Sequence, residues 1–207
     1  MRSLSLLVLA VALPCAAQPV LIADVNPGPG NGFVIELEAL GDDVYFSGKG
    51  AGGTELWRYV TATGTAERVT NLPAQSLKPD NLVDADGVLY FTGTDDAHGR
   101  ELWRYDPVTD VAEIVADLIP GPDPSTPDFT AAFDGDVYFR AYTLGSGKEL
   151  WRYDPDTGTA VQTPEIRAVG SASPVELTPY DGDLYFRDFD DPVGDELWRH
   201  DPVANTN

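Results

Sequence analysis

Glu55-Leu56-Trp57-Arg58 is the first of four copies of one tetrapeptide in this chain. The other copies begin at Glu101, Glu149 and Glu196, so the four tryptophans recur about every 47 residues, at Trp57, Trp103, Trp151 and Trp198. A Tyr-Phe pair precedes each copy and keeps the same period, at Tyr45, Tyr90, Tyr138 and Tyr185. Two markers with one period identify four tandem repeats, which fill residues 18–207.

Turn signals divide each repeat into short strands. In the third repeat, Asp134-Gly135 stands between two apolar runs, and residues 154–158 (Asp-Pro-Asp-Thr-Gly) follow the tryptophan segment. Asp-Gly favours a tight hairpin because glycine readily adopts a positive φ, and Asp-Pro favours a type I turn because proline fixes φ. No part of residues 18–207 shows a sustained helical period. We therefore expect four antiparallel strands in each repeat.

The Val-Tyr-Phe and Leu-Trp segments are apolar on both faces, so each sheet needs a neighbour on both sides. Sheets stacked as blades around an axis meet this need. The sequence predicts an all-β fold, a β-propeller of four four-stranded antiparallel blades. Residues 20–25 resemble residues 113–118, the expected fourth strand of the second repeat, whereas the last repeat lacks that strand. We expect the N-terminal strand to close the last blade by pairing with residues 196–200; the alternative is a fragment of a larger propeller, since the sequence stops in a loop.

The N-terminus has the features of a secretory leader. Arg2 precedes the apolar stretch 4–13, which is too short to span a bilayer, and small residues follow Pro14. We expect residues 1–17 to be a cleaved signal peptide and residues 18–207 to form the exported propeller domain. Cleavage removes Cys15, the only cysteine, which excludes disulfides and cysteine chemistry from the mature chain.

The chain is strongly acidic, with a formal net charge of -21. A surface of this sign repels phosphate backbones and anionic bilayers, so we expect no nucleic-acid partner and no membrane insertion of the mature chain. The same charge keeps a secreted protein soluble.

The repeat resembles that of bacterial exported proteins named for a Glu-Leu-Trp-x-x-Asp-Gly-Thr motif. The resemblance rests on the four Glu-Leu-Trp-Arg segments, the Tyr-Phe strands and the Pro-Gly loops at residues 26–30 and 120–122. The chain departs from the motif in having Asp-Pro-x-Thr-Gly in place of Asp-Gly-Thr, a turn that also resembles kelch repeats without their Gly-Gly pair. Both resemblances imply an exported β-propeller and carry no catalytic residues to transfer.

Residues that are identical in every repeat cannot mark one unique site, so the tetrapeptide indicates a structural role. We expect the tryptophans to be packed between sheets. Because buried charges need partners, we also expect the glutamate of one blade to meet the arginine of the next. The residues concerned are Glu55, Glu101, Glu149 and Glu196 with Arg58, Arg104, Arg152 and Arg199.

Any ligand is expected on the rim that carries the loops after the second and fourth strands of each repeat, because these loops vary while the hairpins on the opposite rim do not. We call this surface the variable rim. Its candidate binding residues are Asp95, Asp96, His98, Arg100, Tyr142, Asp188, Asp190 and Asp191. Asp95, Asp96, Asp190 and Asp191 are also candidate ligands for calcium, the one cofactor considered, although no segment has the order of a dedicated calcium loop, and solvated acidic loops are the favoured interpretation.

These observations favour a binding scaffold, secreted or at the cell surface (the periplasm being a further possibility), whose variable rim contacts protein or carbohydrate. One alternative is an extracellular polysaccharide hydrolase that uses paired carboxylates of the rim. Another is a structural spacer within a larger surface protein. His98 and His200 occupy non-equivalent positions, so the sequence contains no nucleophile-histidine constellation, and no enzymatic activity is expected.

Overall fold

The computed structural model describes residues 18–70, 76–166, 170–190 and 194–207. The predicted leader and Cys15 lie outside these residues. Fifteen strands form the fold: β1 (Ile35–Leu40), β2 (Asp43–Gly50), β3 (Gly53–Val60), β4 (Thr65–Arg68), β5 (Asp80–Ala85), β6 (Val88–Asp95), β7 (Gly99–Asp106), β8 (Val111–Ala116), β9 (Asp128–Phe133), β10 (Asp136–Thr143), β11 (Gly147–Asp154), β12 (Thr159–Gln162), β13 (Val175–Tyr180), β14 (Asp183–Asp190) and β15 (Gly194–His200). No helix in the described part of the chain is long and apolar enough to cross a membrane.

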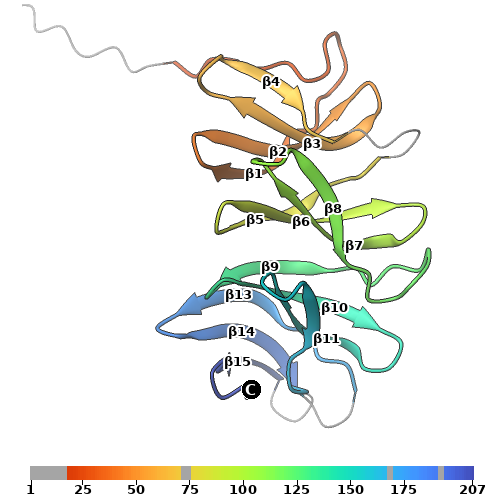
Figure 1. Cartoon of the computed structure of the whole chain (residues 1–207), viewed down its shortest axis with the longest axis vertical. Helices are drawn as coiled ribbons and strands as arrows, with labels where there is room; N and C mark the ends of the chain where they lie inside the picture. Colours follow the sequence, from red (N-terminus) through yellow and green to blue (C-terminus); the bar gives the residue numbers. More distant parts are fainter. Residues whose placement is uncertain (1–17, 71–75, 167–169, 191–193) are drawn as a thin grey trace, which may run out of the picture.

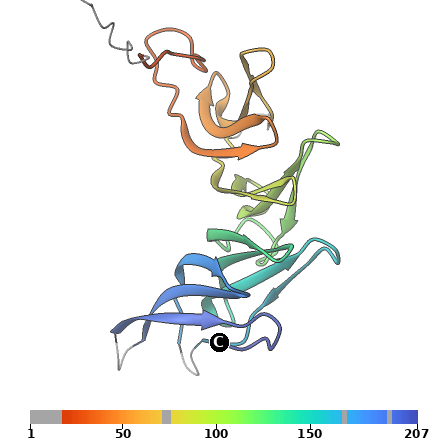
Figure 2. The ribbon, with the colours of Figure 1, turned by 90° about the vertical axis from the view of Figure 1, so that its left-hand side faces the viewer.

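The strands form four antiparallel meanders: sheet 1 (β1–β4), sheet 2 (β5–β8), sheet 3 (β9–β12) and sheet 4 (β13–β15). The sheets follow one another along the molecule in sequence order, with sheet 1 at one end and sheet 4 at the other (Figure 1). The view from the side shows the same succession (Figure 2). The prediction of an all-β fold of blade-like sheets is therefore confirmed.

In sheets 2, 3 and 4 the hairpin between the first two strands is the one predicted from Asp-Gly, whereas sheet 1 has Gly41-Asp42, of which only Gly41 has a positive φ. Asp134 and Gly135 have φ values of 52° and 82°, and Asp86-Gly87 and the equivalent pair in sheet 4 have the same signs. Two consecutive positive φ values belong to a tight turn whose twist matches that of the flanking strands. The register that follows is constant, because each sheet places the phenylalanine of its second strand opposite the tryptophan of its third: Phe46↔Trp57, Phe91↔Trp103, Phe139↔Trp151 and Phe186↔Trp198.

The core lies between the sheets, as three clusters of one design. The tyrosine of the Tyr-Phe pair reaches an aromatic ring of the following sheet: the ring centroids of Tyr45 and Tyr105 are 5.7 Å apart. The same contact joins sheet 2 to sheet 3 and sheet 3 to sheet 4, through Tyr90–Tyr153 and Tyr138–His200. Beside each pair, the leucine of the tetrapeptide is fully buried against the second strand of the following sheet (Leu56, Leu102 and Leu150).

The tryptophans are packed in these layers. Trp103 is buried, and Trp57, Trp151 and Trp198 are half-buried. Trp57 Nε1 donates a hydrogen bond to the carbonyl oxygen of Gly48, 2.9 Å away in the paired strand. A side chain on Gly48 would touch the Trp57 ring, so the indole lies directly over this glycine.

The expected glutamate–arginine pairing between blades is wrong. The buried glutamates instead hold the link that leads to the next sheet: Glu101 Oε1 accepts a hydrogen bond from Ser125 N at 2.6 Å, and Oε2 accepts from the Ser125 hydroxyl. Glu55 accepts from Thr70 Oγ1, and Glu149 accepts from Ala172 N. Backbone and hydroxyl donors of the link bind these carboxylates in place of arginine, although Glu149 Oε2 is buried without a hydrogen-bond partner in the described structure.

The four arginines pair within their own sheets. Arg104 binds Glu113 on β8, and Arg152 Nε lies 3.3 Å from Asp136 Oδ2. Arg58 binds Glu67 in the same way, and Arg199 lies 3.0 Å from Asp183. These partners are on neighbouring strands of one sheet, where a long side chain reaches across the ladder.

The predicted closure by the N-terminal strand is also wrong. Sheet 4 has three strands, and residues 18–34 form none. The Lys49 N–H donates to the carbonyl oxygen of Gly32 at 2.6 Å, which ties this segment to β2. Sheet 1 and sheet 4 lie at opposite ends of the molecule (Figure 1), and residues 20–25, which precede sheet 1, do not pair with residues 196–200 of the same chain.

The stacked leucines make a direct test of the fold. Leu150 is fully buried between sheets 3 and 4, so Leu150→Ala is expected to lower the free energy of unfolding by about 2–5 kcal/mol. Leu144, in the adjoining loop of the same sheet, is 81% exposed, and Leu144→Ala should change it by less than about 0.5 kcal/mol. Urea denaturation followed by tryptophan fluorescence measures both; equal effects would contradict the stacked arrangement.

Glu101→Gln tests the role of the buried glutamates. An amide presents one acceptor oxygen where the carboxylate presents two, so part of the Ser125 donor set loses its partner, at a cost of about 1–3 kcal/mol in the free energy of unfolding. The matched control is Glu113→Gln, which removes an exposed ion pair in the same sheet and should cost less than about 1 kcal/mol. A control that costs as much as Glu101→Gln would show that the buried carboxylate has no special role.

We also expect the stability difference between the wild type and Glu101→Gln to depend on pH. Burial raises the pKa of Glu101 above its ordinary value of 4.5, against the hydrogen bonds from Ser125. The folded state therefore holds this proton at a pH where the unfolded chain has lost it, and the stability it contributes is lost as the pH rises through the raised pKa. The stability of the wild type relative to Glu101→Gln should thus decrease as the pH rises from about 4.5 through the raised pKa of Glu101. If the free energies of unfolding of the wild type and of Glu101→Gln changed equally with pH, this prediction would be refuted.

Candidate functional site

The variable rim is built by contacts between the loops and the links. The start of each third strand binds the link that follows its sheet: Lys78 N donates to Thr54 O at 2.9 Å, and Thr126 N donates to Arg100 O at 3.1 Å. In sheet 3, Lys148 N donates to the Ser171 hydroxyl oxygen at 2.6 Å. Loops after the second strands and links after the fourth strands thus lie on one rim.

Asp95 and His98 form a closed unit at the β6–β7 turn. Asp95 Oδ1 accepts hydrogen bonds from the backbone N–H groups of Ala97 and His98, and Oδ2 lies 2.9 Å from His98 Nδ1. The hydrogen bond to Asp95 raises the pKa of His98. These contacts use both oxygens of Asp95 within its own turn, next to Asp96. Their arrangement is that of a loop-stabilising aspartate.

Arg100 crosses from sheet 2 to the link that enters the same sheet. Its Nη2 donates to Asp80 Oδ2 at 2.9 Å and to the Thr92 hydroxyl, and its Nη1 donates to the Lys78 carbonyl oxygen at 3.3 Å. The guanidinium therefore fixes the inner edge of the rim between sheets 1 and 2. Arg100 also lines a pocket, which is described below.

The other predicted site residues are dispersed. Tyr142 belongs to sheet 3 and is about one third exposed. Asp188 is buried in β14, where its Oδ1 accepts from Ser173 N at 2.5 Å, so it holds a link and does not face a ligand. Asp190 ends β14, but its side chain is not described, and Asp191 lies outside the described residues. His200, in contrast to His98, is buried against Tyr138, and burial lowers its pKa.

The calcium candidates do not meet in the described part of the chain. Asp95 and Asp96 belong to sheet 2, whereas Asp190 belongs to sheet 4, two sheets away (Figure 1). Among the described residues, no three His, Cys, Asp or Glu side chains come together in a way that could hold a metal ion.

The structure shows a cationic pocket that the sequence analysis missed. Lys49, Lys78 and Arg100 line a cavity of about 470 Å³ between sheets 1 and 2, on the variable rim. Phe33, 54% exposed, forms one wall, and Lys49 Nζ lies 5.5 Å from the centre of its ring. Ile35, Ser47, Thr54, Pro79 and Asp80 complete the lining. We call this the cation pocket.

The lysines of this pocket are unusual in so acidic a chain. The protein has three lysines, and two of them are here. Within the described residues, neither Lys49 nor Lys78 forms an ion pair, whereas Arg100 is paired with Asp80. The sequence signal that could have found the pocket is the scarcity of lysine, together with its placement at the end of a second strand and in the following link.

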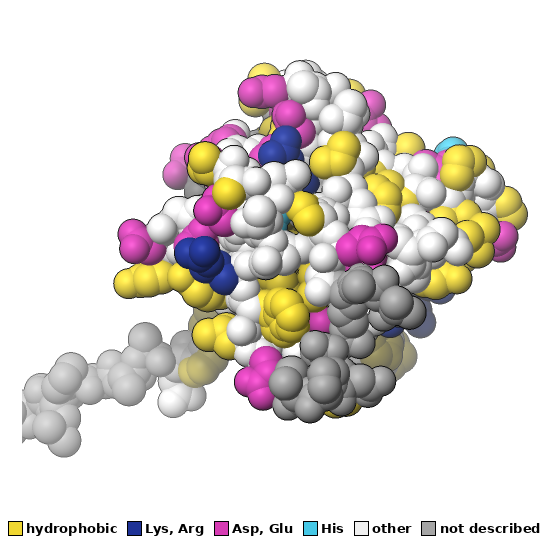
Figure 3. Space-filling model, turned by 90° about the horizontal axis from the view of Figure 1, so that it is seen from below, with side chains coloured by type: hydrophobic (Ala, Val, Ile, Leu, Met, Phe, Trp, Pro, Cys, Tyr) yellow, Lys and Arg dark blue, Asp and Glu magenta, His cyan; other side chains and the backbone are white. Residues whose placement is uncertain are grey.

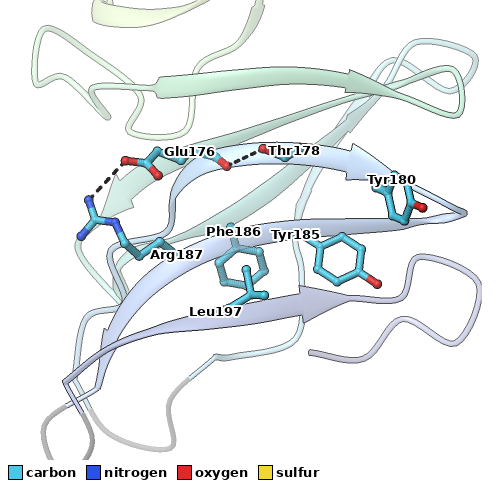
Figure 4. Close-up of a pocket in the computed structure, with 7 residues that line it drawn as sticks. All are labelled: Glu176, Thr178, Tyr180, Tyr185, Phe186, Arg187 and Leu197. Carbon is cyan, nitrogen blue, oxygen red and sulfur yellow. Dashed lines mark hydrogen bonds and ion pairs between the residues drawn. The ribbon is translucent and has the colours of Figure 1, made fainter.

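A second concavity lies on the outer face of sheet 4. It has a volume of about 490 Å³ and a mainly apolar lining from β13, β14 and β15. Tyr180, Tyr185 and Leu197 project into it side by side, and Glu176 meets Arg187 at its edge (Figure 4). The space-filling view from this end of the molecule shows hydrophobic side chains at the surface among acidic ones (Figure 3). We call this surface the open face of sheet 4.

Three solved structures similar to this chain contain β-propeller domains. Puromycin hydrolase matches with a TM-score of 0.62 and 19% identity, over 84% of this chain and 28% of that one. A puromycin-hydrolyzing peptidase of Mycobacterium tuberculosis matches with a TM-score of 0.60 and 12% identity, over 86% and 28%. TolB from Acinetobacter baumannii matches with a TM-score of 0.52 and 16% identity, over 77% and 38%.

No protein-family model matches the chain, and no curated protein matches it in sequence. The chain spans less than two fifths of the length of the three solved structures named above. At these identities the likeness concerns the fold. Together with the four stacked meanders, it shows that this chain is a β-propeller domain.

Proposed function

We propose that this protein is an exported binding scaffold that holds an anionic extracellular ligand, a carbohydrate or a protein segment bearing carboxylates, in the cation pocket. The observation that carries the proposal is a pair of lysines without an ion pair among the described residues, beside an exposed aromatic ring, in a chain with a net charge of -21. The acidic surroundings make these two cations the natural point of attachment for an anion on this rim.

The lining suits such a ligand chemically. Lys49 and Lys78 offer ammonium groups to carboxylates, and Phe33 and Ile35 offer an apolar wall against which the C–H face of a sugar or an aliphatic side chain can pack. Arg100 is held by Asp80 and the Lys78 carbonyl, which fixes one side of the pocket before any ligand arrives. A preformed wall lowers the entropic cost of binding.

Several further observations support the scaffold. The predicted leader at residues 1–17 and the resemblance to exported Glu-Leu-Trp-x-x-Asp-Gly-Thr proteins favour an extracellular or cell-surface location. Asp95 is bound by His98 and Asp188 by Ser173, so two rim carboxylates that a hydrolase could use are engaged in holding loops. A rigid stack that carries variable loops is a common arrangement for recognition.

Binding to carboxylate-bearing polysaccharides tests the proposal. We expect the purified protein to bind uronic-acid polysaccharides more tightly than neutral ones, with an affinity that falls as salt is added, because screening weakens the contact between exposed charges. The double variant Lys49→Glu/Lys78→Glu should weaken binding by about fivefold to thirtyfold, the equivalent of about 1–2 kcal/mol for two exposed charge contacts. Isothermal titration or biolayer interferometry measures the affinity.

Lys148→Glu is the matched control, because Lys148 is the third lysine and lies exposed on the same rim in sheet 3. It should change the affinity by less than about twofold. The same binding measurements with acidic peptides show whether the ligand is a carbohydrate or a protein segment. Failure of both classes to bind, or an equal loss in the control, would overturn the proposal.

A further inference from the structure

We propose that the open face of sheet 4 binds sheet 1 of a second copy of this chain, head to tail, so that two copies close one ring of eight blades. This inference does not depend on the cation pocket. It rests on the three contacts between successive sheets, which serve as an internal template for what each free face should bind.

We call the face that a sheet turns toward the following sheet its trailing face, and the face that it turns toward the preceding sheet its leading face. Each trailing face carries a tyrosine and a leucine. In sheets 1, 2 and 3 this leucine is fully buried, with 0% exposure at Leu56, Leu102 and Leu150. The equivalent residue of sheet 4, Leu197, is 76% exposed. Tyr185 is likewise half-buried, whereas its counterparts Tyr45, Tyr90 and Tyr138 are buried. The open face is thus the one trailing face in the described structure that lacks its cover.

The leading face of sheet 1 shows the complementary gap. Sheets 2, 3 and 4 are each entered by a buried proline (Pro79, Pro127 and Pro174), whereas Val34, at the same position of sheet 1, is 47% exposed. Tyr59 is half-buried at the place where Tyr105, Tyr153 and His200 are buried against the preceding sheet. The leading face of sheet 1 therefore carries the partner groups that the open face lacks.

The template pairs these groups individually. Tyr45 meets Tyr105, so Tyr185 would meet Tyr59 of the second copy. Leu102 packs with Val137 and Phe139, so Leu197 would pack with the equivalent half-buried residue of sheet 1, Val44, next to Phe46, which is already buried. Each contact of the template occurs three times in the molecule, which makes a fourth use of the same surfaces the simplest way to bury them.

The edge strands of sheet 4 and of sheet 1 also fit the head-to-tail contact. Glu36 Oε2 accepts from Asn81 N at 2.9 Å, a contact between the bulged first strands of sheets 1 and 2. Glu176, which has the same place in β13, would accept in turn from Glu36 N of the second copy. Residues 20–22 are exposed and apolar, and sheet 4 has a free edge at β15, where the second copy could add the missing fourth strand.

We take the occupant to be a second copy because its sheet 1 presents Tyr59 and Val34 where the sheet-to-sheet contacts require partner groups, while the chain's own sheet 1 lies at the far end of the molecule (Figures 1 and 2). A head-to-tail contact forms a ring when its rotation closes. Two copies give eight blades, which is within the known range of four to eight. Because both copies are acidic and the contact is apolar, added salt should strengthen it, the opposite of the salt effect on the cation pocket.

The oligomeric state of the purified protein, measured by light scattering after size exclusion, tests the proposal. We expect two copies for the wild type and one copy for Leu197→Glu and for Val34→Glu. Both residues are exposed in the single chain, so neither change should unfold it, which circular dichroism verifies. Leu144→Glu, an equally exposed leucine in sheet 3, is the control and should leave two copies.

A mixture of the two monomeric variants distinguishes head-to-tail from face-to-face contact. Leu197→Glu keeps an intact leading face and Val34→Glu an intact trailing face, so the mixture can form one good contact and should regain a two-copy species. A wild type that remains single at tens of micromolar, a dimer that survives either substitution, or a mixture that stays monomeric would each overturn the proposal. None of these results bears on polysaccharide binding.

Discussion

Contact between successive sheets is the interaction on which the rest of this structure depends. A meander of this composition has a hydrophobic residue on each face of its middle strands, so a sheet in isolation would expose one of them to water. Burying a leucine and an aromatic ring on each side removes that cost, at about 25 cal/mol for every Å² of apolar surface. The constant register of phenylalanine opposite tryptophan places these residues at the same height in every sheet. One pattern of contact can therefore be used throughout.

Most of the fold could be predicted from the sequence because its signals are local and repeated. Asp-Gly determines the hairpin, alternation determines the two faces of a strand, and the period of the tryptophans determines the number of sheets. The error about the N-terminal segment has a different origin. The likeness of residues 20–25 to residues 113–118 reports strand propensity, whereas pairing depends on where the ends of a long stack lie, and no local signal contains that.

The candidate site was predictable only in part. Arg100 was identified and lines the cation pocket, whereas Asp188 was taken for a loop residue and is buried in a strand. Its position corresponds to Gly48, Gly93 and Ala141, where the other sheets have small residues facing the following strand. Lys49 and Lys78 were missed because they lie far apart in sequence and meet only when a link folds back over the start of a third strand. The role of the glutamates was missed for the same reason, since their donors come from links of irregular sequence.

The glutamate contacts give the stack a direction. In the described structure, each of the three buried carboxylates accepts a hydrogen bond from a link that comes later in the sequence, and none accepts one from an earlier link. During synthesis, a blade therefore acquires its last hydrogen bonds only when the following segment has emerged. The glutamate of sheet 4, Glu196, is exposed to water, so the hydrogen bonds that close the first three sheets are not repeated there in the described structure. The contacts between a sheet and its link therefore run in one direction along the sequence.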